Sequence, residues 1–150
     1  MLAGLDVGLL AGLPAVTWLL LHSWLRGEPW WAKLNVAGAL FYGGSVYTMG
    51  LSRASLAGCA LLIAGYASLG VVFGFVGRTR GIARNLILGL LVALAWQIVC
   101  QQYLLRLLDS FAPVYYPPLS TLPAQLMFGI GLGRFAPRFQ ALAAGLGDPS

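Results

Sequence analysis

Five apolar stretches of 17 to 23 residues alternate with short polar connections along this 150-residue chain. The first four stretches contain no Asp, Glu, Lys or Arg. A helix needs about 20 mainly apolar residues to cross the hydrocarbon core of a bilayer. The pattern therefore predicts an all-α, polytopic membrane bundle of about five transmembrane helices. The expected spans are Val7–Leu25, Leu34–Gly50, Ala54–Val76, Asn85–Leu105 and Leu119–Ala136.

The second and fifth stretches are the least regular of the five. The second has 17 residues and contains Gly38, Gly43, Gly44 and Gly50. As a helix it would be about 26 Å long from the helical rise per residue, so we expect it to be short, kinked or partly re-entrant. The fifth contains Pro123 in its first turn. Proline is tolerated there because a first-turn N–H has no partner within the helix.

The positive charge falls mainly in every second connection. With five crossings, seven Lys and Arg residues lie on one side of the membrane and two on the other. Cytoplasmic connections carry the excess of Lys and Arg, so the pattern predicts an N-terminus outside and a C-terminus inside. Without the fifth crossing the split would be five against four. The inside set is Arg26, Lys33, Arg78, Arg80, Arg84, Arg134 and Arg138, and the outside set is Arg53 and Arg106.

The composition excludes a water-soluble domain. Hydrophobic residues make up 59% of the chain and charged residues 9%, whereas roughly 25% charged residues is typical of soluble domains. The net charge of +5 is scattered at the ends of the stretches, which favours a topology signal over nucleic-acid binding. We expect one transmembrane domain over residues 1–140 and a short polar tail over 141–150. The expected partner of this domain is the lipid bilayer of a cell membrane. The short connections suggest that this membrane is a prokaryotic inner membrane.

Polar side chains within the spans give the best candidate for a binding site, because they are costly in hydrocarbon unless they find partners or water. Gln97, Cys100 and Gln101 share one helix face through i, i+3 and i+4 spacing. Gln125 of the fifth stretch is expected at a similar depth, and Tyr66 is expected near the midplane of the third stretch. Such groups could line a polar pocket in the outer half of the membrane that holds a small neutral ligand. The alternative is hydrogen bonding between helices, which needs no ligand.

Glycines recur at four-residue spacing in three of the stretches. Small residues let helix backbones approach closely, so these faces predict either packing within the bundle or contact with a membrane-protein partner or a second copy. The glycines concerned are Gly4, Gly8 and Gly12, then Gly70 and Gly74, then Gly129 and Gly133.

The chain offers little chemistry for catalysis. All four carboxylates lie outside the spans or at their ends, and His22 is the single histidine. Five crossings would place His22 at the opposite depth from Cys100. No cofactor-binding or metal-binding motif is present. We therefore expect that the protein is not an enzyme and that it binds no cofactor. The expected function is a small accessory or assembly subunit that packs through glycine-rich faces. The alternative is a small-molecule carrier or substrate-binding membrane subunit with a pocket in the outer half.

Overall fold

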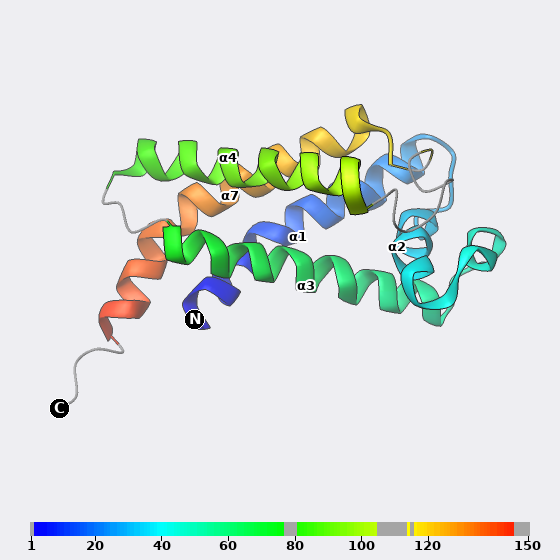
Figure 1. The fold of residues 1–150 in the computed structure, drawn as a ribbon, viewed down its shortest axis with the longest axis horizontal. Helices are drawn as coiled ribbons and strands as arrows, with labels where there is room; N and C mark the ends of the chain where they lie inside the picture. Colours follow the sequence, from blue (N-terminus) through cyan, green and yellow to red (C-terminus); the bar gives the residue numbers. More distant parts are fainter. Residues whose placement is uncertain (1, 77–80, 105–113, 115, 146–150) are drawn as a thin grey trace.

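The computed structural model describes residues 2–76, 81–104, 114 and 116–145 (Figure 1). All the secondary structure in these ranges is helical. Four long helices are joined by shorter elements, and no strand occurs in the described ranges. The elements are α1 (Leu2–Leu25), α2 (Ala32–Tyr42), the 3₁₀-helix η1 (Gly44–Thr48), α3 (Arg53–Val76), α4 (Ile82–Val99), the π-helical turn η2 (Cys100–Leu104) and α7 (Pro118–Gly145).

The long helices run antiparallel in the order α4, α7, α1, α3, and α2 packs on α3 (Figure 1). The apolar core lies mainly where α1 meets α7 and α3. Phe128 of α7 and Leu132 one turn later are fully buried there, and the Phe128 ring lies 4.7 Å from the Tyr66 ring between centroids. Although α3 and α4 follow each other in the sequence, they touch only slightly. The bundle therefore consists of two helix pairs, α1 with α3 and α4 with α7, joined by the α1–α7 contact.

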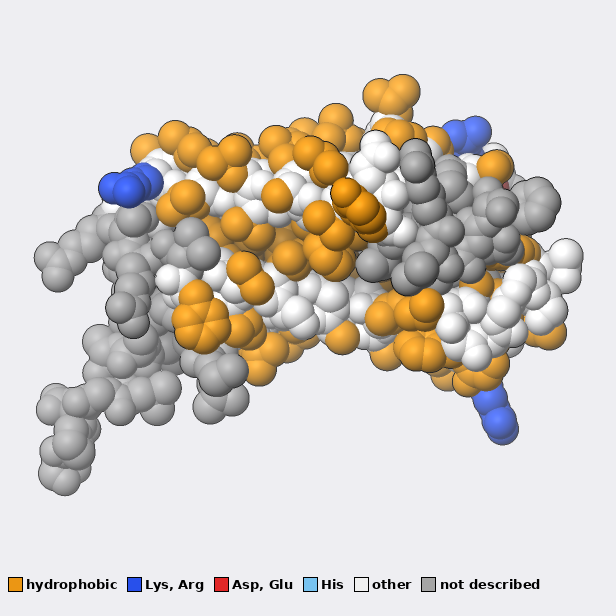
Figure 2. Space-filling view, in the orientation of Figure 1, with side chains coloured by type: hydrophobic (Ala, Val, Ile, Leu, Met, Phe, Trp, Pro, Cys, Tyr) orange, Lys and Arg blue, Asp and Glu red, His pale blue; other side chains and the backbone are white. Residues whose placement is uncertain are grey.

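The exterior of the bundle is apolar. Large hydrophobic side chains are exposed along α1, α3 and α4, among them Leu13, Leu56 and Leu91. Figure 2 shows hydrophobic side chains over much of the described part of one face. Three described helices are long and apolar enough to cross a membrane, at Gly4–Leu25, Arg53–Phe75 and Ile82–Tyr103. An apolar exterior is stable against acyl chains, and a helix satisfies its own backbone hydrogen bonds there.

Residues 34–50 do not form one helix. Helix α2 has 11 residues and ends at Tyr42, so it is only about 16 Å long. Gly43 follows with a φ of 76°, a backbone conformation that glycine adopts without a steric penalty. The chain then forms η1 and returns to α3. In Figure 1 the last turn of α1 and the first turn of α3 lie at the same end of the bundle.

The buried side chain of Asn35 explains why this segment folds back. Its Nδ2 donates hydrogen bonds to the carbonyl oxygens of Val46 at 3.1 Å and Met49 at 2.9 Å, and approaches that of Gly50 at 3.3 Å. Its Oδ1 accepts a hydrogen bond from Ser55 Oγ in α3. One amide thus ties together α2, η1 with the segment after it, and the start of α3. Because irregular backbone needs such partners away from water, Asn35 makes the return possible.

The glycine faces lie between the helices of this chain. A Cβ on Gly8 would lie 2.7 Å from the Tyr66 carbonyl oxygen of α3. One on Gly70 would lie 2.4 Å from Gly8 Cα, and one on Gly133 would lie 2.6 Å from Leu86 Cα of α4. Gly4, Gly12 and Gly129 make similar approaches, whereas Gly74 is half-buried. These contacts of Gly4, Gly8, Gly12, Gly70, Gly129 and Gly133 are packing within the bundle.

Helix α7 extends into the residues of the expected tail. Helix α7 begins at Pro118, close to the expected start, but continues to Gly145. Residues 141–145 are therefore helical, and residues 146–150 lie outside the described part of the chain.

Candidate functional site

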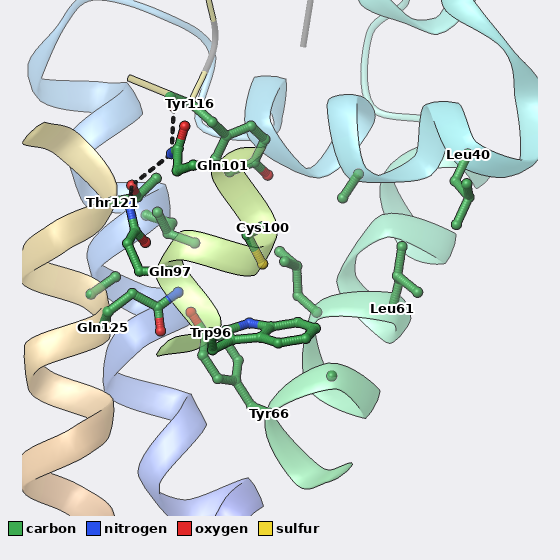
Figure 3. Close-up of a pocket in the computed structure, with 15 residues that line it drawn as sticks. Leu40, Leu61, Tyr66, Trp96, Gln97, Cys100, Gln101, Tyr116, Thr121 and Gln125 are labelled. Atoms are coloured by element: carbon green, nitrogen blue, oxygen red, sulfur yellow. Dashed lines mark hydrogen bonds between the residues drawn. The ribbon is translucent and has the colours of Figure 1, made fainter. Parts of the chain in front are cut away.

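A cavity of about 320 Å³ lies where all the helices come together near the α2 end of the bundle (Figure 3). The five residues expected to form a polar pocket all line it. Most of the lining is apolar, with the polar groups gathered on the α4 and α7 side. The lining residues are Leu19, Ala37, Leu40, Leu61, Leu62, Gly65, Tyr66, Trp96, Gln97, Cys100, Gln101, Tyr116, Thr121, Ala124 and Gln125.

Two of the glutamines, Gln97 of α4 and Gln101 of η2, are held by hydrogen bonds to α7 and to Tyr116 just before it. Gln97 Nε2 donates to Thr121 Oγ1 at 2.6 Å. Gln101 Nε2 donates to the Tyr116 carbonyl oxygen at 3.0 Å and approaches Thr121 Oγ1 at 3.3 Å (Figure 3). Each such bond in a membrane protein contributes about 0.6 kcal/mol on average. These two amides therefore serve to join the helices as well as to line the cavity.

Gln125 differs from the other two glutamines. Its side chain lines the cavity and is directed toward Tyr66 in Figure 3. The residue is only 6% exposed, and its Oε1 is buried with no hydrogen-bond partner. A buried acceptor without a partner is costly. Its Oε1 is thus an acceptor without a partner on a residue that lines the cavity.

The position of α1 at the cavity corrects one expectation about depth. Five crossings placed the last turns of α1 opposite Gln97 and Cys100. In the structure Leu19 lines the same cavity as Gln97, and Trp18 Nε1 donates a hydrogen bond to the Ser120 carbonyl oxygen at 3.2 Å. The reason is that the chain folds back after α2, so α3 begins at the end of the bundle where α1 ends (Figure 1).

Among the lining residues that were not predicted as site residues, three carry polar groups, namely Trp96, Tyr116 and Thr121. Thr121 precedes Gln125 by one helical turn, so the i, i+4 pattern that joined Gln97 to Gln101 also applied to this pair. Trp96 is next to Gln97 in the sequence, but no sequence pattern indicated that its side chain would line a cavity. Tyr116 lies before α7, where its aromatic side chain indicated only a membrane interface.

The two cysteines occupy different surroundings. Both are free thiols and both are half-buried. Cys100 lines the cavity, and its Sγ is drawn toward the open space in Figure 3, whereas Cys59 is not among the lining residues. One thiol therefore reports on the cavity and the other on the bundle outside it.

A second polar cluster lies beside the cavity, at the start of α2. Lys33 is 0% exposed, and its Nζ lies 2.8 Å from His22 Nδ1. Burial lowers the pKa of Lys33; the nearby Glu28 carboxylate opposes this shift and Arg26 adds to it. One hydrogen bond joins this cluster to the cavity. The hydroxyl of Tyr116, which lines the cavity, donates to the Lys33 carbonyl oxygen at 2.6 Å.

The remaining candidate groups form no further site among the described residues. No cluster of three or more His, Cys, Asp or Glu side chains suited to a metal ion occurs there. Of the arginines between the third and fourth stretches, Arg84 is exposed, while Arg78 and Arg80 lie outside the described residues.

Comparison with known protein families, with curated proteins and with solved structures finds no match for this chain. The function is therefore inferred from the geometry of the cavity.

Proposed function

We propose that this chain crosses a cell membrane four times, with α2 as a half-length helix that enters and returns on one side. Helix α7 is not among the three candidate spans, but it packs along two of them. A Cβ on Gly131 would lie 2.9 Å from Ala11 Cβ in α1, and one on Gly129 would lie 2.9 Å from Leu90 Cα in α4. A helix packed along two crossing helices shares their depth.

Four crossings place both ends of the chain on one side. The side with the chain ends then carries Arg78, Arg80, Arg84, Arg134 and Arg138, and the side with α2 carries Arg26, Lys33, Arg53 and Arg106. The split is five against four, and Lys33 is buried within the protein. The excess favours cytoplasmic chain ends, which puts the cavity in the outer half of the membrane.

Reporter fusions test this topology. We expect a fluorescent or phosphatase reporter at either end to indicate the cytoplasm, and a reporter inserted after Gly50 to indicate the outside. Reporters on opposite sides at the two ends would support the five-crossing arrangement, with the N-terminus outside. The measurement is the ratio of the two reporter activities at each position in intact cells.

For the function, we propose that the protein is a non-catalytic membrane subunit or carrier that binds a small neutral molecule in the cavity. The observation that carries this proposal is the cavity itself, because it brings Gln97, Gln101, Gln125, Cys100 and Tyr66 together. The described lining residues contain no carboxylate, imidazole or ammonium group. A charged ligand would therefore meet no opposite charge, and binding is favoured over acid–base catalysis.

The volume limits the size of the ligand. An engineered apolar cavity of about 150 Å³ holds a benzene ring. The cavity of about 320 Å³ is roughly twice as large and so fits a molecule of about a dozen non-hydrogen atoms by proportion. The largely apolar lining with a few convergent polar groups is typical of ligand pockets.

The accessory-subunit function receives less support from the structure. It depended on glycine-rich faces that contact a partner, and the glycines with described contacts pack against helices of this chain. A partner or a second copy would have to bind through the apolar side chains of the exterior. The cavity is the feature that distinguishes a binding subunit from a purely structural one.

Alkylation of Cys100 tests ligand binding. In bilayer nanodiscs we expect 1-decanol, which has eleven non-hydrogen atoms by formula (about the size estimated above), to slow the reaction of Cys100 with N-ethylmaleimide several-fold. Cys59 on the same chain is the internal reference, because it does not line the cavity. Site-resolved mass spectrometry gives both rates.

Two leucine variants of α3 provide the control. A Cβ on Gly65 would meet only Trp96, at 3.9 Å, so Gly65→Leu fills the cavity without a backbone clash. Ala64→Leu introduces the same side chain at an exposed position one residue earlier. We expect protection by 1-decanol to vanish in Gly65→Leu and to persist in Ala64→Leu. No protection of the native chain, or equal protection in both variants, would refute binding in this cavity.

A further inference from the structure

The three glutamines that line the cavity differ in their hydrogen bonds, because Gln125 has a buried Oε1 without a partner. Gln97 and Gln101 already use their Nε2 donors within the protein. The Nε2 of Gln125 lies on the Tyr66 side of the amide in Figure 3, beside the phenol. Among the residues that line the cavity, Gln125 carries the one fully buried side-chain oxygen that has no partner in the described part of the chain.

We propose that the ligand is a neutral amphiphile with a hydroxyl or N–H donor at its head, and that Gln125 turns its Oε1 toward the cavity to accept the hydrogen bond from this donor. This inference rests on the proposed binding function and specifies its ligand class. A donor head would supply the missing hydrogen bond of Oε1. An apolar body would occupy the side of the cavity lined by Leu61, Leu62 and Gly65.

The recognition is expected to discriminate between molecules of equal size. An ether or a saturated hydrocarbon fits the same space but leaves Oε1 without a partner. A site that keeps an unpaired buried polar group on binding loses the affinity of that hydrogen bond. We therefore expect the molecule without a donor to bind roughly 10-fold more weakly.

Two isomers make the comparison direct. 1-Decanol and methyl nonyl ether have the same formula, and only the alcohol has a donor. Each is added to nanodiscs at equal mole fraction in the bilayer, and the concentration that halves the rate of Cys100 alkylation is measured relative to Cys59. We expect the ether to need roughly 10-fold more than the alcohol. Equal protection by the two isomers would overturn the donor assignment.

Gln125→Met supplies the matched variant, because methionine has a similar length and no oxygen. We expect this variant to protect Cys100 equally with either isomer, since the preference for the alcohol is lost. Should the variant fail to fold, the comparison of the isomers on the native chain still decides.

The outcomes separate the two proposals. Failure of both isomers to protect Cys100 would refute the binding function. Equal protection by both isomers would leave the binding function standing and refute only the role of Gln125. A preference for the alcohol that persists in Gln125→Met would assign the donor contact to another lining group and overturn the inference.

Discussion

Gly58→Ala is expected to destabilise the protein by about 3 kcal/mol or more, the upper range for overpacked cores. A Cβ at this position would lie 1.9 Å from the Leu34 carbonyl oxygen and 2.8 Å from the Gly38 backbone nitrogen. Both neighbours are backbone of α2, so the helices have to separate. Because Ala37 and Leu40 of α2 line the cavity, the change also disturbs the site. Thermal unfolding in detergent, followed by circular dichroism, measures the loss.

Gly65→Ala is the matched control on the same helix. A Cβ there meets only Trp96, at 3.9 Å. Alanine is favoured over glycine within a helix by up to about 1 kcal/mol, so this variant is expected to be slightly more stable. Helix propensity acts alike on both substitutions, and only the contact with α2 differs. If Gly58→Ala were as stable as Gly65→Ala, the close crossing of α2 and α3 would be wrong.

Lys33→Met is expected to raise stability near neutral pH by about 1 kcal/mol or more, as found when buried charged groups are replaced by apolar ones of similar volume. Lys33 is fully buried, and its amine faces His22, which carries no negative charge to offset its own. The Glu28 carboxylate contributes an opposing field but forms its ion pair with Arg26, at 3.8 Å. Methionine keeps the aliphatic volume and removes the charge.

The pH dependence gives the same prediction an independent measurement. Burial lowers the pKa of Lys33 in the folded protein below its ordinary 10.5. Between the lowered pKa and 10.5 the unfolded chain binds more protons, so stability rises as pH increases through this window and levels off above it. We expect Lys33→Met to remove this rise. Unfolding temperatures between pH 7 and pH 11 measure it.

Lys33→Arg is the contrasting variant. A guanidinium stays charged throughout this pH range, so we expect lower stability and no alkaline rise from this position. A large loss of stability in Lys33→Met at neutral pH would contradict this account, because it would show that the charged amine stabilises the fold.

The sequence predicted the helices better than their connections. The all-helical fold is confirmed, and α3 begins one residue before the expected span and ends with it at Val76. Apolar length sets these bounds, and length is read directly from a sequence. The grouping of Gln97, Cys100 and Gln101 could be predicted for a similar reason, since helical periodicity puts them on one face. Gln125 and Tyr66 line the same cavity, as their expected depth suggested.

The return of the chain after α2 could not be predicted from apolar length. It depends on the backbone of Gly43 and on Asn35, whose amide reaches carbonyl groups more than ten residues away. An apolar segment of 17 residues is compatible either with a short membrane-spanning helix or with a segment that folds back. The burial of Lys33 was missed for a related reason, because a basic residue at the end of a stretch is typical of a headgroup contact.

The small contact between α3 and α4 has a consequence for biogenesis. Each helix pair, α1 with α3 and α4 with α7, holds together by its own close glycine crossings. In the proposed membrane topology, we therefore expect α1 and α3 to pack together before α4 is synthesised. The cavity takes its walls from both pairs, so it exists only after the hairpins dock. Ligand binding would then indicate that the two helix pairs have docked. A protein produced as two fragments, divided between α3 and α4, would still contain both halves of the site.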